Sequence, residues 1–256
     1  MKHQQKNFYK LFKFFPAVGL VLCSSLFVCI SSKAQELAEM QAEKAFENAV
    51  NEYDSYLGKN SFLYTGSSYV GPYSGIIGHQ FFFDDYWEQG NIIYDQSSFD
   101  SIYLKYDIYT DNLLIENFGL NGLPSHMKLY GPKVTYFLLH GYTFIRIEND
   151  TLSNMKDGFY NLLYDGISVQ AVAKRRKEIV EAHEQNTIRE IFVQKDKFYI
   201  KKGGKYNQVR NKKSILKVLE DRKKEVKSYI KSQGIYFKVD PDDKLIEVVR
   251  YYDSLF

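Results

Sequence analysis

Apolar and polar side chains alternate along several short stretches of the chain, most regularly over residues 102–109. Ile102, Leu104, Tyr106 and Ile108 would lie on one face of a strand there, with the intervening residues on the other. This alternation is typical of a strand that buries one face. Further strands are expected at residues 79–83, 92–94 and 113–116.

Turn residues between apolar runs predict consecutive hairpins. His140-Gly141-Tyr142, Asp165-Gly166 and Gly203-Gly204 each lie between two such runs. Asp165-Gly166 is the strongest signal, because a type I′ turn needs a positive φ at both central residues. Consecutive hairpins favour an antiparallel meander, since parallel strands need long crossovers. The expected strand pairs are 134–139 with 143–147, 159–164 with 167–172, and 197–202 with 205–209.

The spacing of apolar residues becomes helical near both ends of the chain. Residues 36–57 are expected to form a helix, which either caps the sheet, the interpretation we favour, or acts as a spacer from the membrane. One C-terminal helix would carry Ile215, Leu219, Val226 and Ile230 and end at Gly234. A second would begin at Asp240-Pro241-Asp242-Asp243, where Asp240 offers a capping carboxylate and Pro241 suits the first position.

The pattern therefore predicts an α+β fold, in which an antiparallel β-meander sheet of several hairpins is flanked by an N-terminal helix and two C-terminal helices. Residues 175–185 would interrupt the sheet as a helical turn or a solvated loop. We divide the chain into a signal peptide (1–34), an N-terminal helix (35–58), a β-rich core (59–210) and a C-terminal helical part packed on the sheet (211–256).

The first 34 residues have the pattern of a secretory signal peptide. A basic head with Lys2, Lys6, Lys10 and Lys13 precedes an apolar run from Pro16 to Ile30. That run is shorter than a membrane span, and Ser32-Lys33-Ala34 places small residues at a cleavage site. We therefore expect an exported protein, in the periplasm or at the outer-membrane surface, with no transmembrane span in the mature chain.

A lipid anchor at Cys29 is the alternative form of processing. Leu26-Phe27-Val28-Cys29 loosely resembles a lipobox, but Val28 is bulky where that signal has a small residue. This favours soluble release after Ala34.

Removal of the leader also changes the charge and the cysteine content. The whole chain has 34 Lys and Arg against 31 Asp and Glu, and the leader holds five of the lysines and no acid. The mature chain therefore has 29 basic and 31 acidic residues, a net charge of −2, and the indication of a nucleic-acid partner is lost. Both cysteines, Cys23 and Cys29, lie in the leader, which excludes disulfides and cysteine chemistry from the mature protein.

The richest cluster of chemically active side chains is His79 to Glu88, which combines a histidine, three acids and the only tryptophan. A metal or sugar site is one interpretation. The simpler one is a buried strand that leads into a solvated turn, with Trp87 packed at a sheet edge. His79 and Asp84 would fall on opposite faces of a regular strand. His79, Asp84, Asp85 and Trp87 are thus the candidate ligand-binding residues.

No motif predicts catalysis. The other mature histidines, His126, His140 and His183, are scattered, and no H-E-x-x-H, G-x-S-x-G or phosphate-loop spacing occurs. We expect no cofactor, no metal site and no catalytic residue recognisable from the sequence.

Two basic runs remain. Lys174-Arg175-Arg176-Lys177 could contact anionic lipid or polysaccharide, although Glu178 and Glu181 partly offset its charge. Lys223-Lys224 lies opposite the apolar stripe of its predicted helix and is most simply a solvated face.

Three segments resemble a family of uncharacterised exported proteins common in Bacteroidota. They are Leu104 to Asp111, Gly158 to Gly166, and Tyr251 to Leu255, and the resemblance spans most of residues 75–256. It implies an exported protein and no particular activity. We expect a non-catalytic envelope protein that binds an envelope protein or glycan through a sheet face, helped by its many tyrosines. The alternative is a periplasmic hydrolase whose site is built from dispersed His and Asp residues.

Overall fold

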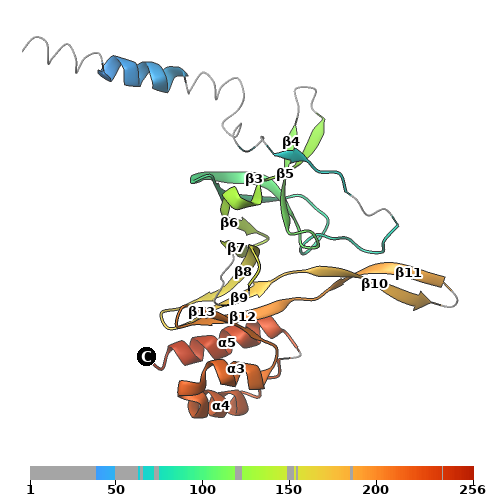
Figure 1. Cartoon of the computed structure of the whole chain (residues 1–256), viewed down its shortest axis with the longest axis vertical. Coiled ribbons are helices and arrows are strands. Elements are labelled where there is room, and N and C mark those ends of the chain that lie inside the picture. The colour runs from blue at the N-terminus through green and yellow to red at the C-terminus, as the bar shows by residue number, and fades with distance from the viewer. Residues whose placement is uncertain are drawn as a thin grey trace, which may run out of the picture. The chain divides into compact units, whose positions relative to one another are not determined.

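The computed structural model describes residues 39–49, 63, 66–71, 75–118, 123–148, 153, 155–184, 187–237 and 239–256 (Figure 1). The chain divides into two units, residues 1–61 and 62–256. In the first unit, residues 39–49 form a helix with exposed side chains, so the N-terminal helix is confirmed and its role as a cap or spacer stays a prediction. The expected signal peptide lies outside the described residues.

The second unit is built on one long antiparallel sheet, which confirms the predicted α+β meander. Its eleven described strands run in the order β1-β5-β4-β3-β2-β6-β7-β8-β9-β12-β13. Most neighbours in the sheet are therefore neighbours in the chain. The strands are β1 (Ser67–Ser68), β2 (Glu88–Tyr94), β3 (Ser97–Asp107), β4 (Asn112–Phe118), β5 (Pro124–Lys128), β6 (Val134–Leu139), β7 (Tyr142–Ile147), β8 (Gly158–Asp165), β9 (Gln170–Lys174), β12 (Lys197–Lys202) and β13 (Lys205–Val209).

Two of the predicted turns have the expected backbone conformation. His140 and Gly141 have φ values of 52° and 77°, and Gly203 and Gly204 have φ values of 57° and 79°. These consecutive left-handed residues are those of type I′ hairpin turns, which match the twist of the flanking strands.

The Asp165-Gly166 hairpin forms through a wider loop than the predicted two-residue turn. The strands pair from Asp165 to Gln170, and the Gly166 amide donates to the Val169 carbonyl at 3.0 Å. The Asp253 carboxylate accepts hydrogen bonds from the backbone amides of Ile167 (3.1 Å) and Ser168 (2.7 Å). A side chain at Gly166 would collide with Asp253, so the glycine is needed for close approach and not for a positive φ.

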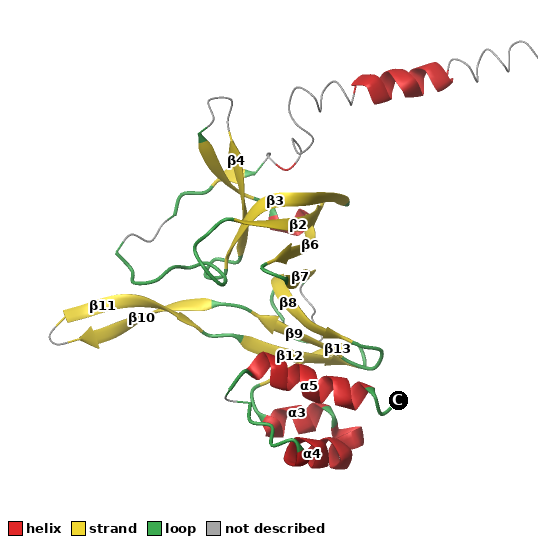
Figure 2. Cartoon of the chain, turned by 180° about the vertical axis from the view of Figure 1, so that it is seen from behind, coloured by secondary structure: helices red, strands yellow, loops and turns green. Residues whose placement is uncertain are grey.

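Residues 175–185, expected as a helical turn or loop, instead contribute most of a strand. β10 (Lys177–Glu184) pairs with β11 (Thr187–Gln194) in a two-stranded ribbon that continues β9 and β12 beyond the sheet (Figures 1 and 2). We call this ribbon the arm. Its side chains are half-buried or exposed along its described length, so it lacks the alternation that marks a strand in a sheet with one buried face.

Residues 79–83, expected as a strand, form a loop with a single bridge between Phe81 and Asp107. Phe83 has a φ of 64°, which interrupts an extended conformation. Phe82 and Phe81 are nevertheless buried, so the apolar run covers the sheet. Among the described residues it is bonded to the sheet only at this bridge, where the Phe82 amide donates to the Tyr106 carbonyl at 2.8 Å.

Helices α3 (Lys212–Val218) and α5 (Pro241–Asp253) cover one face of the sheet from β8 to β13, and α4 (Lys223–Ser232) packs on these two helices (Figure 2). The expected first C-terminal helix is divided into α3 and α4 by a 3₁₀ turn (η3, Glu220–Arg222). Asn211 caps α3 by accepting from the Ser214 amide at 3.0 Å. Asp240, expected to cap α5, has a left-handed φ of 45° and makes no side-chain capping bond.

Two main cores lie along the sheet. The first is formed by β2 to β8 and is rich in aromatic rings: Phe137 and Phe144 stack at 4.6 Å, and Tyr106 contacts both edge-on. The second lies between the helices and the sheet, where Ile200, Val209 and Ala171 face Leu245, Val248 and Leu219. In the described residues, no helix is both long enough and apolar enough to cross a membrane.

Arg175 connects the sheet, the arm and the helices. Its side chain is 5% exposed and donates to Asn161 Oδ1 of β8 (2.6 and 3.1 Å), to Asp196 Oδ2 (2.8 Å) and to the Asp242 carboxylate of α5. Burial alone would lower the pKa of Arg175, but the hydrogen bonds and charge of Asp242 and Asp196 outweigh it and raise the pKa. The charge is therefore retained inside the fold.

Gly158→Ala should lower the free energy of unfolding by about 2 kcal/mol or more. Gly158 has a φ of 144°, and a Cβ there would collide with the Asp111 carboxylate, which accepts from Lys174 Nζ at 2.7 Å and Tyr106 OH at 2.5 Å. Urea unfolding measures the loss. Gly141→Ala is the control, because its Cβ would meet nothing within 4 Å and only a φ of 77° opposes it. Equal losses would contradict the proposed collision.

Arg175→Lys should cost about 3 kcal/mol of stability, although the formal charge is kept. A lysine lacks the planar fork that reaches Asn161, Asp196 and Asp242 together, so buried partners would lose hydrogen bonds. Thermal and urea unfolding of the variant measure this cost. Arg176→Lys, one position along the chain and 29% exposed at its side chain, should cost far less. A similar cost for both variants would show that the Arg175 contacts contribute little.

Candidate functional site

The predicted cluster forms a loop over residues 79–87, held against the base of the arm by Lys177. Lys177 Nζ donates to the backbone carbonyls of His79 (2.7 Å) and Phe81 (2.8 Å). The His79 ring accepts from the Phe81 amide at 3.2 Å. The side chains of Lys177 and His79, which could otherwise bind a ligand, are thus used to hold the loop in place.

Asp85 and Trp87 share Lys105 as a partner. The Lys105 ammonium donates to Asp85 Oδ1 at 2.9 Å and lies 4.6 Å from the Phe81 ring centre and 4.8 Å from the Trp87 ring centre. Lys105 is 8% exposed, so its ammonium group is largely shielded from water, whereas the Asp85 side chain is 57% exposed. The arrangement stabilises the loop on β3.

Two further histidines, His140 and His126, contact this loop at separate points. His140 Nε2 lies 3.6 Å from Asp84 Oδ1, and the His140 ring stacks on Phe83 at 4.8 Å. His126 lies 4.8 Å from the Trp87 ring, with Nε2 3.3 Å from Glu116 Oε1.

The loop therefore brings His79, Asp84, Asp85 and Trp87 into one segment, but their contacts are with different groups: His79 with Lys177, Asp84 with His140, and Asp85 and Trp87 with Lys105. Among the described residues, no three His, Cys, Asp or Glu side chains are grouped so that they could hold a metal ion. The cavities near the base of the arm and beneath the C-terminal helices are lined by other residues. Ligand binding by these four residues stays a prediction.

A different surface lies on the sheet face opposite the helices. Side chains alternate along β12, so Ile200 faces the helices, and Tyr199 packs with Tyr160, Val172 and Tyr206 on the other side. We call this second side the tyrosine face. Met155, which is 1% exposed, covers its centre. Lys197 and Tyr199 near the arm remain half-buried at its margin.

A cavity of about 350 Å³ opens where the arm leaves the sheet, and Phe198, Gln208 and Val209 form the uncharged part of its lining. Four cations line it together with two acids, and we call it the basic cavity. Its charged residues are Arg176, Lys195, Lys197 and Arg210, with Glu178 and Asp196. The formal charge of this lining is therefore +2.

Both acids of the basic cavity are already engaged. Asp196 accepts from Arg175 Nη1 (2.8 Å), Gln194 Nε2 (2.8 Å) and the Arg176 amide (3.2 Å), and Glu178 pairs with Arg176. No carboxylate in the described residues pairs with Lys195, Lys197 or Arg210. Lys195 and Arg210 are exposed, and Lys197 is half-buried.

The electrostatics of the cavity reflect this crowding of positive charge. Burial lowers the pKa of Lys197, and the nearby charges of Arg176, Arg210 and Lys156 lower it further. Burial raises the pKa of Tyr199, and the same two guanidinium groups oppose that rise. The charges of Arg176 and Arg210 thus act to lower the pKa of both Lys197 and Tyr199, so these four side chains lie close together.

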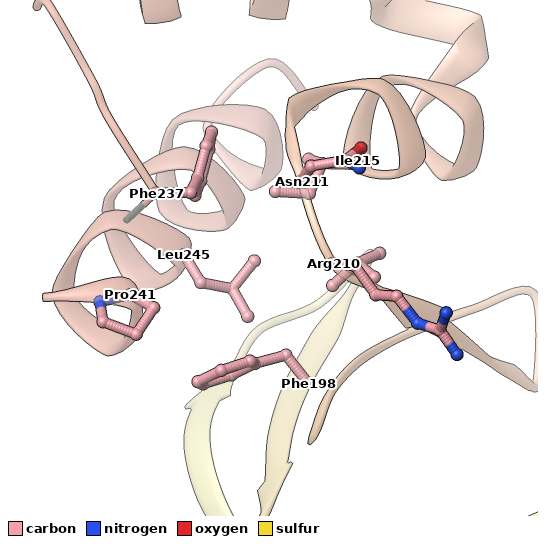
Figure 3. Close-up of a pocket in the computed structure, with 8 residues that line it drawn as sticks. Phe198, Arg210, Asn211, Ile215, Phe237, Pro241 and Leu245 are labelled. Atoms are coloured by element: carbon pink, nitrogen blue, oxygen red, sulfur yellow. The ribbon is translucent and has the colours of Figure 1, made fainter. Parts of the chain in front are cut away.

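Next to the basic cavity lies an apolar cavity of about 180 Å³, between the helices and the sheet, and the two share Phe198, Val209 and Arg210 in their linings (Figure 3). Phe198, Phe237 and Leu245 converge on it, whereas the Arg210 guanidinium points away. Its volume is below the range of about 300 Å³ and more that is usual for ligand pockets. We interpret it as a packing gap between the helices and the sheet.

Sequence reasoning did not find the basic cavity. Its cations follow β9 (Arg176), β11 (Lys195) and β13 (Arg210) or begin β12 (Lys197), so their proximity depends on strand register. The run from Lys174 to Lys177 was the available signal. The fold divides that run: Lys174 pairs with Asp111, Arg175 is buried, Lys177 holds the 79–87 loop, and Arg176 lines the cavity.

Comparison with known proteins adds no relative: no family model, curated protein or solved structure matches this chain. The resemblance to exported Bacteroidota proteins therefore stays a prediction, and function must be argued from the site itself.

Lys177→Met should raise the pKa of His79 toward the usual value of about 6.5. Burial and then the Lys177 charge lower the pKa of His79 in the folded protein. Below about pH 6.5 the unfolded chain therefore binds more protons at His79, and stability falls as the pH decreases toward the lowered pKa. NMR titration of the His79 ring measures the shift. Lys195→Gln should leave it unchanged, and an unmoved His79 in the Lys177 variant would refute the coupling.

Proposed function

We propose that the chain is an exported, non-catalytic envelope protein that binds an envelope glycan or protein through the tyrosine face of its sheet. This proposal rests mainly on the unequal coverage of the two faces of the sheet. Among the described residues, helices cover one face, whereas on the other face Met155 is buried in the cluster around Tyr160 and Tyr199 stays half-buried, with Arg176 and Arg210 near it. A half-buried tyrosine offers a ring for contact and a hydroxyl for hydrogen bonding, as binding surfaces require.

The tyrosine face is also rigid, which supports a binding role. β12 is paired on both sides, with β9 and β13, and Tyr199 packs edge-on against Tyr160 at 5.9 Å. Side chains on a paired strand are held in place before a ligand arrives, so little conformational entropy is lost on binding.

The alternative, a periplasmic hydrolase, would use the pairs His140–Asp84 or His126–Glu116. Each pair has aromatic neighbours, and each histidine has a carboxylate within 3.6 Å. A hydrolase also needs an aligned nucleophile and a group that stabilises negative charge. No contact in the described residues joins either histidine to a serine or threonine hydroxyl. We therefore prefer the binding role.

Tyr199→Ala should weaken binding to a glycan or envelope protein that the intact chain retains by about tenfold or more. The exported form of the chain is screened against oligosaccharides and purified envelope proteins, and the affinity for each retained partner is measured by calorimetry. Tyr236→Ala is the matched control, since Tyr236 is 76% exposed and lies after α4, away from the tyrosine face.

Tyr199→Phe separates the ring from the hydroxyl and guards against a loss of folding, because it keeps the packing against Tyr160. The proposal would fail if both tyrosine sites behaved alike, if nothing bound in a Tyr199-dependent way, or if the protein hydrolysed members of the panel.

A further inference from the structure

We infer that the outer edge of β10 binds a basic, extended segment of a partner protein, which adds to the arm as a third strand. This surface is made by different strands from the tyrosine face and goes beyond the proposed function. The inference rests on the unpaired main chain of β10, on the two-stranded form of the arm and on the negative charge along it.

Every second residue of β10 points its main-chain N–H and C=O groups away from β11. At the base of the arm, the Lys177 amide donates outward to the Ile108 carbonyl at 3.4 Å. Since outward and inward residues alternate along an antiparallel strand, Ile179, Glu181 and His183 also point their groups outward. In the part of the chain that the structure describes, no strand and no backbone hydrogen bond occupies the outer side of these three residues.

The other edges of the two sheets are short or occupied, as is usual in proteins that avoid unwanted strand pairing. β1 has two residues. On β13, the Tyr206 amide donates to Ser153 Oγ at 2.9 Å. On the other side of the arm, the Glu190 carbonyl and the Phe192 amide of β11 both bond to the backbone of Ile77 (2.9 and 3.0 Å). Among the described strands, the outer edge of β10 is therefore the one that is both long and uncovered.

The arm is long for a ribbon of two strands. β10 and β11 pair in an unbroken register from Lys177–Gln194 to Glu184–Thr187. Residues 178–194 contain no proline and no lysine, which are common means of protecting an exposed edge. Two-stranded ribbons are marginally stable in water, and a third strand adds stability when it covers apolar side chains. Val180 and Ile191, which are paired across the ribbon and half-buried, would be covered further in this way.

The charge of the arm favours a basic strand as the occupant. Residues 178–194 hold four glutamates and one arginine, a net charge of −3 with His183 neutral. Glu181 and Glu190 lie directly opposite each other on one face, and like charges in such a pair are destabilising. A lysine or arginine of a third strand, placed opposite Glu181, would pair with it and offset this repulsion. A second copy of the arm would instead bring its own excess of glutamates.

Strand addition of this kind joins two sources of affinity. The main chain of the added segment completes the hydrogen-bond ladder, and its alternate side chains determine which segment is accepted. Here the ladder would be supplied by Ile179, Glu181 and His183, and the preference for a basic residue by Glu181. The two contributions can be tested separately.

The probe is a blocked peptide, Lys-Thr-Val-Lys-Val-Ile-Thr, which places its central lysine opposite Glu181 when it pairs antiparallel with β10. It is titrated by calorimetry into the exported form of the chain. We expect binding that weakens with added salt, and at least tenfold weaker binding when glutamate replaces both lysines. Equal affinities for the two peptides would overturn the inference.

N-methylation of the peptide separates strand addition from simple attraction. A methyl group on the amide of the central lysine removes a donor that faces β10 and should weaken binding at least tenfold. The same group on the amide of the following valine faces away from β10 and should leave the affinity within about twofold. Equal effects of the two methyl groups would show that no ladder forms.

Hydrogen exchange followed by NMR locates the bound peptide. The Glu181 and His183 amides should exchange rapidly in the unliganded protein and slowly in the complex. The Ala182 amide, which points toward β11, should be protected in both states. Protection that appears at another strand, with Glu181 and His183 unchanged, would place the peptide elsewhere and overturn the inference.

Glu181→Lys should reduce the affinity for the lysine peptide at least tenfold and increase the affinity for the glutamate peptide. Glu225→Lys is the matched control, because it makes the same charge change at an exposed residue of α4 and should leave both affinities within about twofold. Equal losses in the two variants would show non-specific attraction.

His183→Pro blocks the edge without removing an acidic charge. The His183 N–H is not used in pairing with β11, so proline is compatible with the ribbon there and should reduce peptide affinity at least tenfold. Thermal unfolding verifies that each variant folds. A His183→Pro variant that folds and binds the peptide as tightly as the parent chain would overturn the inference.

Two further outcomes would assign the edge or the peptide differently. A dimer of the unliganded chain in analytical ultracentrifugation, abolished by His183→Pro, would assign the edge to a second copy and overturn the inference. Tyr199→Ala should leave peptide binding within about twofold, and a tenfold loss would place the peptide on the tyrosine face. Absence of Tyr199-dependent binding to any glycan or envelope protein would overturn the proposed function and leave this inference intact.

Discussion

The buried guanidinium of Arg175 is the interaction on which the arrangement of the second unit depends. It joins β8 through Asn161, the start of β12 through Asp196 and the first turn of α5 through Asp242. A buried charge is tolerated only when its donors are satisfied, so these three elements must meet at one point. That requirement fixes where the arm leaves the sheet and where α5 begins. It also occupies Asp196, which would otherwise neutralise the basic cavity.

Three segments, Leu104 to Asp111, Gly158 to Gly166 and Tyr251 to Leu255, supply much of this internal polar framework. Tyr106 and Asp111 come from the first segment, and Gly158, which makes room for the Asp111 carboxylate, comes from the second. Asp253 of the last segment holds the 166–169 loop by accepting from two backbone amides. Burial alone would raise the pKa of Asp253, but these hydrogen bonds lower it and keep the carboxylate charged.

Local patterns predicted most of the sheet because local physics determines those parts. The strands around His140-Gly141 and Gly203-Gly204 follow from alternation and from residues that accept a positive φ. The arm was missed because its side chains are half-buried or exposed and show no alternation, and the turn at Asp165-Gly166 was altered by Asp253, 88 residues away in the chain. The basic cavity escaped prediction for a similar reason. Nothing in the run Lys174 to Lys177 reveals which cation acquires a carboxylate, since that depends on contacts with Asp111, Asp196 and Asp242.

The strand order has a consequence for how the protein folds. β2 to β5 and β6 to β9 are two series of sequential hairpins, and the pairing of β2 with β6 joins them. Sequential hairpins close short loops and form early. Pairing of β2 with β6 closes a loop that contains β3, β4 and β5, so its entropy cost is larger. Gly90 lies in β2 against β6, where any side chain would collide with the Leu138 carbonyl. Pairing of β2 with β6 is therefore the expected slow step of folding. Until this pairing forms, the chain would hold two separate half-sheets.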